Sequence, residues 1–194
     1  MKENHLTLLC EHYKNVVNSI KKEIEKRDKF FLFMLIVILG LMIQIADQDL
    51  FTIIFKRLTG INDDSIINKN IMSTLLWGLT LFIFIRYSQT CSTIEREYLY
   101  LKEIETKINY EYDGDIVFKL ESSFYKDKKN HIRNTNKIIF KIIFPVMFLI
   151  AIFIKSYNEF YLGQFNLYTY LNCGIAIVIT HNIIFSMLNV NKGQ

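Results

Sequence analysis

The feature that most constrains this sequence is a set of four apolar segments, each 17 to 21 residues long. At 1.5 Å per residue, a helix of that length measures about 26 to 32 Å, close to the hydrocarbon thickness of a bilayer. Blocks this long and this apolar do not suit the core of an ordinary soluble domain. The sequence therefore predicts an all-α fold, a four-helix transmembrane bundle with spans at residues 30–46, 71–87, 138–154 and 168–188.

The distribution of lysine and arginine predicts how these spans are oriented. Residues 1–29 carry seven basic side chains and residues 86–141 carry eleven, whereas the two other connecting segments carry three and one. Basic residues concentrate on the cytoplasmic side of membrane proteins. We therefore expect a multi-pass protein whose N- and C-termini and long central segment are all cytoplasmic.

Four regions follow from these boundaries. They are a cytoplasmic amphipathic helix, two spans with the outer loop that joins them, a cytoplasmic helical domain, and two further spans with a short cytoplasmic tail. Their ranges are residues 1–29, 30–87, 88–137 and 138–194.

Two polar regions carry apolar stripes at helical spacing. Apolar residues return every three or four positions from Leu6 to Ile24 and again from Tyr87 to Ile108. Each stripe needs a covering partner, so we expect the two to pair as a cytoplasmic helical or coiled-coil extension, within one chain or between copies. Residues 108–120 then alternate around an Asp-Gly-Asp turn, which fits either a short β-hairpin or a helix that ends at Gly114.

The charge of the central segment is balanced, with nine basic and nine acidic residues between positions 88 and 137. We therefore expect no direct contact with nucleic acid from the segment as a whole. The exception is a basic cluster before the third span, which suits anionic lipid at the inner surface. An acidic partner or a nucleic-acid backbone is the alternative. The cluster comprises Lys126, Lys128, Lys129, Arg133, Lys137 and Lys141.

Three residues inside the spans are candidates for a role within the membrane. Pro145 predicts a kink, and a hinge is the functional alternative. For His181 there are two interpretations. Its neutral imidazole forms a hydrogen bond with Gln44 or with a hydroxyl group, or it belongs to a proton or ion relay. The four spans contain no acidic residue, which counts against a proton-coupled transporter and against a carboxylate-lined pore.

Searches for catalytic motifs find no phosphate-binding glycine loop, no nucleophile elbow and no zinc-binding helix. The cysteines at positions 10, 91 and 173 have neither metal nor redox spacing. The sequence therefore predicts a protein that is not an enzyme, with no cofactor, no metal and no disulfide.

The layout of the chain resembles a known family. Four spans, an N-terminal helix, the segment IEREYLYLKEIETKI after the second span and FPVMF in the third together look like the small membrane proteins of bacterial antiphage operons. The closest are the KwaA proteins, the membrane subunits of the Kiwa defence system. The resemblance covers most of the chain by layout but includes no catalytic motif.

This resemblance implies a homo-oligomer, such as a tetramer, in the bacterial inner membrane. It would sense envelope disturbance by phage and engage a cytoplasmic DNA-binding partner similar to KwaB. Alternatives are a pore-forming effector that depolarises the cell, a membrane accessory of a CRISPR system, and a small transporter. The partner contacts implied on the central helix are Glu95, Arg96, Tyr98, Tyr100, Lys102 and Glu103.

Overall fold

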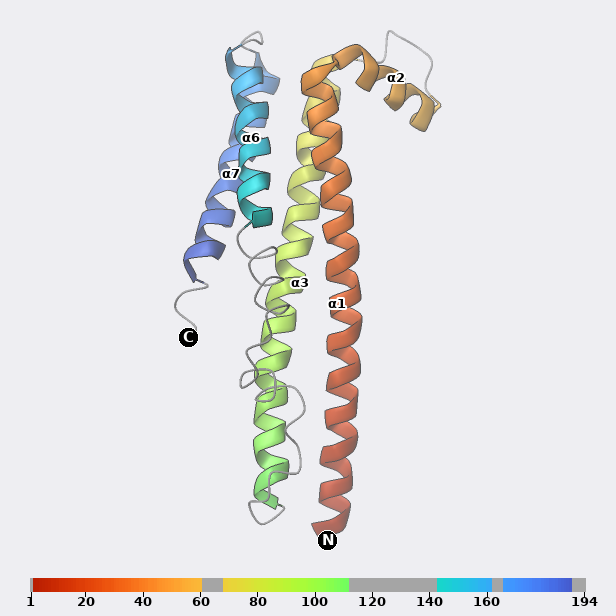
Figure 1. The fold of residues 1–194 in the computed structure, drawn as a ribbon, viewed down its shortest axis with the longest axis vertical. Coiled ribbons are helices and arrows are strands. Elements are labelled where there is room, and N and C mark those ends of the chain that lie inside the picture. Colours follow the sequence, from red (N-terminus) through yellow and green to blue (C-terminus); the bar gives the residue numbers. More distant parts are fainter. Residues whose placement is uncertain (1, 61–67, 112–142, 162–165, 190–194) are drawn as a thin grey trace. The chain divides into compact units, whose positions relative to one another are not determined.

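The computed structural model describes residues 2–60, 68–111, 143–161 and 166–189, and these residues form five helices and no strand (Figure 1). This confirms the all-α prediction. The helices are α1 (Lys2–Ala46), α2 (Gln48–Thr59), α3 (Lys69–Glu111), α6 (Phe144–Tyr161) and α7 (Leu167–Asn189).

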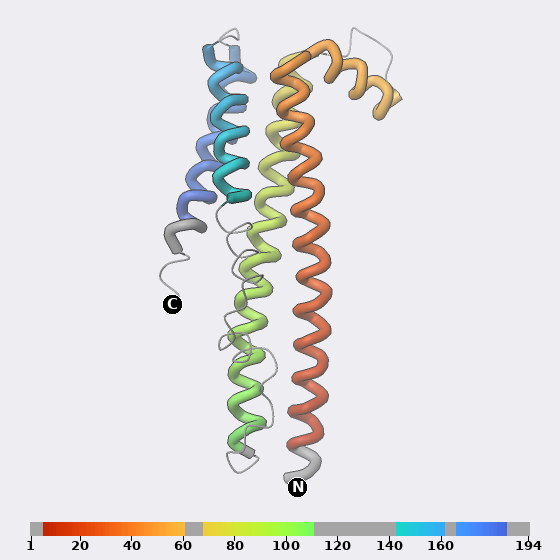
Figure 2. Tube along the Cα trace, viewed as in Figure 1, coloured from red at the N-terminus to blue at the C-terminus, as the bar shows by residue number. Residues whose placement is uncertain are grey.

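The chain divides into two compact units. Unit 1 comprises Met1–Phe31 and Arg86–His131, and unit 2 comprises Leu32–Ile85 and Ile132–Gln194. The helices α1 and α3 each run without a break from one unit into the other, as the continuous tubes of Figure 2 show.

In unit 1, the N-terminal part of α1 and the C-terminal part of α3 pair as antiparallel helices. Ser19 donates a hydrogen bond to Glu97 at 2.8 Å, and Tyr13, farther toward the N-terminus, donates to Glu105 at 3.4 Å. The buried apolar side chains of α3 in unit 1 are separated by seven, three and four residues. These intervals are typical of a coiled-coil seam. The buried apolar residues of this seam are Ile20 of α1 and Ile94, Leu101, Ile104 and Ile108 of α3.

The pairing of the two apolar stripes is therefore confirmed within one chain. The helix α3 continues through Glu111, so the first residues of the suggested hairpin at 108–120 are helical. The rest of that segment, including Gly114, lies outside the described residues.

Unit 2 contains the apolar ends of α1 and α3 together with α2, α6 and α7. Its core includes Leu41 of α1, Trp77 of α3, Phe148 of α6 and Ile179 of α7, each at most 1% exposed. The rings of Phe84 and Phe148 stack with centroids 5.9 Å apart, which joins α3 to α6.

Within the described ranges, three helices, α1, α3 and α7, are long and apolar enough to cross a membrane, which is compatible with a multi-pass membrane protein. The predicted third span, residues 138–154, begins outside the described residues, and its described part opens α6.

Pro145 is the second residue of α6 as described. The residues that would form the other side of the expected kink lie outside the described ranges.

The helix α2 has well-formed caps at both ends. The Asp47 carboxylate accepts hydrogen bonds from the backbone N–H groups of Asp49 and Leu50, and Gly60 ends the helix at a φ of 71°. The N–H of Gly60 donates to the carbonyl of Lys56 at 2.8 Å. The segment predicted as the loop between the first two spans therefore contains a helix with its own start and stop signals, and none of this helix's residues is buried.

Candidate functional site

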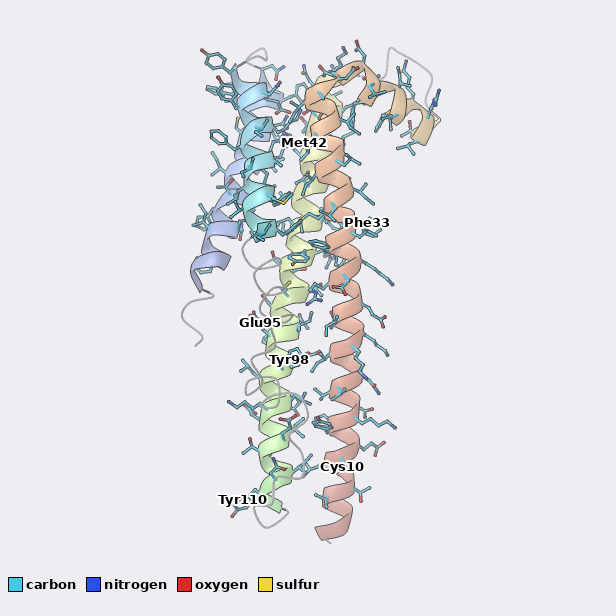
Figure 3. All side chains as sticks on the ribbon, in the orientation of Figure 1. Cys10, Phe33, Met42, Glu95, Tyr98 and Tyr110 are labelled. Atoms are coloured by element: carbon cyan, nitrogen blue, oxygen red, sulfur yellow. The ribbon has the colours of Figure 1, made fainter. Side chains whose placement is uncertain are left out.

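The six predicted partner contacts are all exposed residues on the part of α3 that belongs to unit 1. Glu95, Arg96 and Glu103 lie on the side of the helix opposite the buried seam, as their spacing from Leu101 requires. Figure 3 shows Glu95 and Tyr110 projecting from the side of α3 away from α1. The fold therefore leaves this surface uncovered by α1.

The other three predicted contacts divide between the two flanks. Tyr98 and Lys102 lie on one flank, and Tyr100 lies on the other, where its hydroxyl group is 2.7 Å from Nε2 of His12. The two rings also meet edge to face, with centroids 5.6 Å apart. Tyr100 is thus engaged with α1, which makes it a weaker candidate for contact with a separate protein.

Two large apolar residues on the same outward side were not among the predicted contacts. Leu99 is 66% exposed and Tyr110 is 85% exposed. Leu99 lies between Arg96 and Glu103 at intervals of three and four residues, so it belongs to their face. We call Glu95, Arg96, Leu99, Glu103 and Tyr110 the outward face of α3. Its apolar centre surrounded by charge resembles the composition of a protein contact surface.

The remaining predicted residues do not gather at one place. Gln44 is buried in unit 2, and its side-chain oxygen has no hydrogen-bond partner in the described part of the chain. His181 is exposed on α7 and stacks on Phe185, and among the described residues no hydrogen bond joins it to Gln44. The basic cluster from Lys126 to Lys141 lies outside the described residues.

A buried polar cluster in unit 2 was not predicted. It is centred on the carboxylate of Glu159 near the end of α6. Lys155 Nζ lies 2.9 Å from Oε1, Asn172 Nδ2 donates to Oε2 at 2.9 Å, and Trp77 Nε1 donates to both oxygens at 3.1 and 3.2 Å. Ser73 Oγ donates to Oε1. We call these five residues the Glu159 cluster.

The Glu159 cluster joins three helices at one carboxylate. Ser73 and Trp77 come from α3, Lys155 and Glu159 from α6, and Asn172 from α7. The side chains of Lys155 and Glu159 are only 5% and 14% exposed. Withdrawing two charges from solvent is costly, and it is tolerated where the charges pair and their remaining hydrogen-bonding capacity is used. Here the carboxylate meets four donor groups.

The sequence contained a signal for this cluster. Phe144, Phe148, Ile152, Lys155 and Glu159 follow one another at intervals of three or four residues, so the two charges continue the apolar face of the helix. The predicted span ends at residue 154, so both charges lie just outside it. The predicted span 138–154 contains no acidic residue, but the helix α6 continues beyond it to Tyr161 and carries Glu159.

Among the described residues, no group of three or more histidine, cysteine, aspartate and glutamate side chains could hold a metal ion. Cys10, Cys91 and Cys173 form no disulfide in the described part of the chain. Comparison of the chain with protein-family models, curated proteins and solved structures finds no match. Function must therefore be argued from the chain itself.

Proposed function

We propose that this protein is an oligomeric inner-membrane scaffold or sensor that binds a cytoplasmic partner protein through the outward face of α3. In this proposal the chain crosses the membrane four times, with α6 and the residues before it forming the third span. Both termini and unit 1 face the cytoplasm, in keeping with the excess of lysine and arginine in residues 1–29 and 86–141. The resemblance to KwaA proteins is the ground for placing the protein in bacterial antiphage defence.

The observation that carries the proposal is that one side of α3 in unit 1 is buried and the other is exposed. One side packs against α1 in the seam, where Leu101 and Ile108 are fully buried. The other side presents Leu99 and Tyr110 to solvent among charged residues. An exposed apolar centre with a polar rim supports binding of another protein better than binding of a small molecule, which requires a concave site.

The mixed charge of this face also indicates the class of partner. Glu95 and Glu103 lie beside Arg96, so the surface has no dominant sign that would attract a nucleic-acid backbone. A protein with complementary charges around an apolar contact fits it better. If the resemblance holds, that partner is a DNA-binding subunit similar to KwaB, and the membrane protein itself does not touch DNA.

Co-purification from the native host tests this proposal. A tagged chain, extracted in mild detergent, is expected to carry one cytoplasmic protein encoded near its own gene. Charge reversal at Arg96 or at Glu103, and Leu99→Asp, should each release that protein. Glu25→Lys is the matched control, because it reverses an exposed charge on α1 in the same unit but away from the outward face of α3.

Retention of the partner by all three α3 variants would refute the proposed surface. Cleavage of unit 1 in intact spheroplasts by a protease added from outside would refute the proposed topology. An unchanged response to phage after deletion of the gene would refute the role in defence while leaving the scaffold proposal standing.

A further inference from the structure

The side of α7 that faces away from its own chain carries polar groups as well as apolar ones. Asn172, Ala176, Ile179 and Ile183 form the buried side of the helix. On the opposite side, positions seven residues apart hold Gly174 and His181, and both are exposed. An uncovered imidazole on such a helix is the observation that needs an explanation.

His181 lies far from either end of its helix. It follows the start of α7 at Leu167 by 14 residues, or about 21 Å, and precedes the end at Asn189 by about 12 Å. Because α7 is apolar and long enough to cross a membrane, this position falls within the hydrocarbon if the helix spans. Lipid chains offer neither donors nor acceptors there, so an exposed imidazole is unfavourable unless another polar group covers it.

The neighbouring side chains do not satisfy the imidazole within the described part of the chain. Phe185 stacks on the His181 ring with centroids 6.3 Å apart, and this contact uses neither ring nitrogen. Asn182 donates its amide N–H back to the carbonyl of Val178 at 2.8 Å. The carboxamide oxygen and one remaining N–H of Asn182 stay available beside His181.

The same side of α7 permits a close approach of another helix. A Cβ atom added at Gly174 would meet nothing within 4 Å, so the backbone there is open to a partner. Exposed Val178 and Phe185 flank the imidazole on the next turns. Small residues that let backbones approach, together with a polar side chain that bonds across the contact, characterise helix pairs within membranes.

We propose that Gly174, Val178, His181 and Phe185 form the contact between two copies of this chain, with His181 of one copy hydrogen-bonded to His181 or Asn182 of the other. This rests on the proposed membrane function, and it names the surface through which the oligomer forms. A second copy suits the face because a neutral imidazole and the carboxamide of Asn182 each offer a donor and an acceptor, so His181 and Asn182 of one copy can form two equivalent hydrogen bonds with Asn182 and His181 of the other across a two-fold axis. A copy also brings its polar groups to the same depth in the bilayer.

Disulfide trapping in native membranes tests the contact. In a chain whose three cysteines are replaced by serine, Val178→Cys is expected to form a dimer on mild oxidation. Phe153→Cys is the matched control, because Phe153 is 72% exposed on α6 but lies on a different helix. His181→Leu should reduce the trapped fraction of Val178→Cys by about threefold to tenfold, and His181→Gln, which keeps a donor and an acceptor, should retain most of it.

Equal trapping at positions 153 and 178 would overturn the contact, because it would report random collision. A Val178→Cys adduct with a different protein, or no effect of His181→Leu, would overturn it as well. If the chain sits in the membrane and binds its partner while Val178→Cys stays monomeric, this inference fails alone. If the chain is recovered outside the membrane, the proposed function fails first.

Discussion

The ammonium group of Lys155 lies 2.9 Å from Oε1 of Glu159, one turn farther along α6, and both side chains are nearly withdrawn from solvent. A pair of this kind adds little net stability over well-packed apolar residues, yet breaking it leaves one uncompensated buried charge. The pair therefore acts as a strong local constraint on which helix faces can meet. It holds α6 against Trp77 of α3 and Asn172 of α7.

Glu159→Leu is expected to be among the most destabilising single substitutions in unit 2. It leaves the Lys155 ammonium buried without its counterion and removes the acceptor of Trp77 and Asn172, at a cost of about 3–5 kcal/mol. Thermal unfolding in detergent, followed by circular dichroism, measures the loss. The double variant Lys155→Met/Glu159→Leu should recover most of it, and a double variant as unstable as Glu159→Leu would contradict the explanation by unpaired charge.

Leu101→Ala and Leu99→Ala make the same chemical change two residues apart on α3. Leu101 is fully buried in the seam of unit 1, whereas Leu99 is 66% exposed. We expect Leu101→Ala to destabilise by about 2–5 kcal/mol and Leu99→Ala to change stability by less than about 0.5 kcal/mol. Chemical denaturation of the two variants gives the comparison, and similar losses would mean that the seam is misassigned.

Glu97→Leu is expected to stabilise unit 1. Glu97 occupies a seam position, where Ser19 donates to Oε1 but Oε2 is buried and has no partner among the residues that the structure describes. A half-satisfied carboxylate at such a position lowers the stability of a helix pair, and leucine fits the spacing. We expect a gain of about 1 kcal/mol in the unfolding free energy. The Ser19→Ala/Glu97→Leu variant, which also removes the orphaned hydroxyl group, should be at least as stable.

Asp47→Ala is expected to loosen the start of α2 without affecting the seam of unit 1. The substitution removes the acceptor for two backbone N–H groups, which costs about 0.5–2 kcal/mol, whereas Asp47→Asn keeps an acceptor and should be nearly neutral. Amide hydrogen exchange at residues 49–52 reports the local change. Equal exchange in both variants would argue against the cap.

The sequence was sufficient for those features that depend on local periodicity. Stripes at three- and four-residue spacing predicted that the region from Leu6 to Ile24 would pair with the region ending at Ile108, and hydrogen bonds such as Ser19 to Glu97 confirm this pairing. The partner contacts Glu95, Arg96 and Glu103, which the resemblance implied, lie on α3 away from the seam. Leu99 belongs to the same face by its spacing. From the sequence alone, however, an apolar residue next to a buried stripe is easily assigned to the core, and its exposure becomes clear only once the positions of the seam are known.

The Glu159 cluster required information that no single segment contains. A lysine and a glutamate after an apolar run usually mark the polar end of a span, so the predicted span stops at residue 154, whereas α6 continues to Tyr161. The Glu159 carboxylate accepts hydrogen bonds from side chains of α3 and α7. These donor residues lie 82 to 86 positions before and 13 positions after Glu159 in the sequence. Pairing at that range depends on tertiary packing and not on local propensity.

The chain contains one tryptophan, and it is Trp77, whose indole is fully enclosed and bonded to Glu159. Ultraviolet fluorescence excited selectively at the indole therefore originates from a single spot in the whole protein. Without any attached dye, a spectral shift would signal rearrangement where α3, α6 and α7 meet.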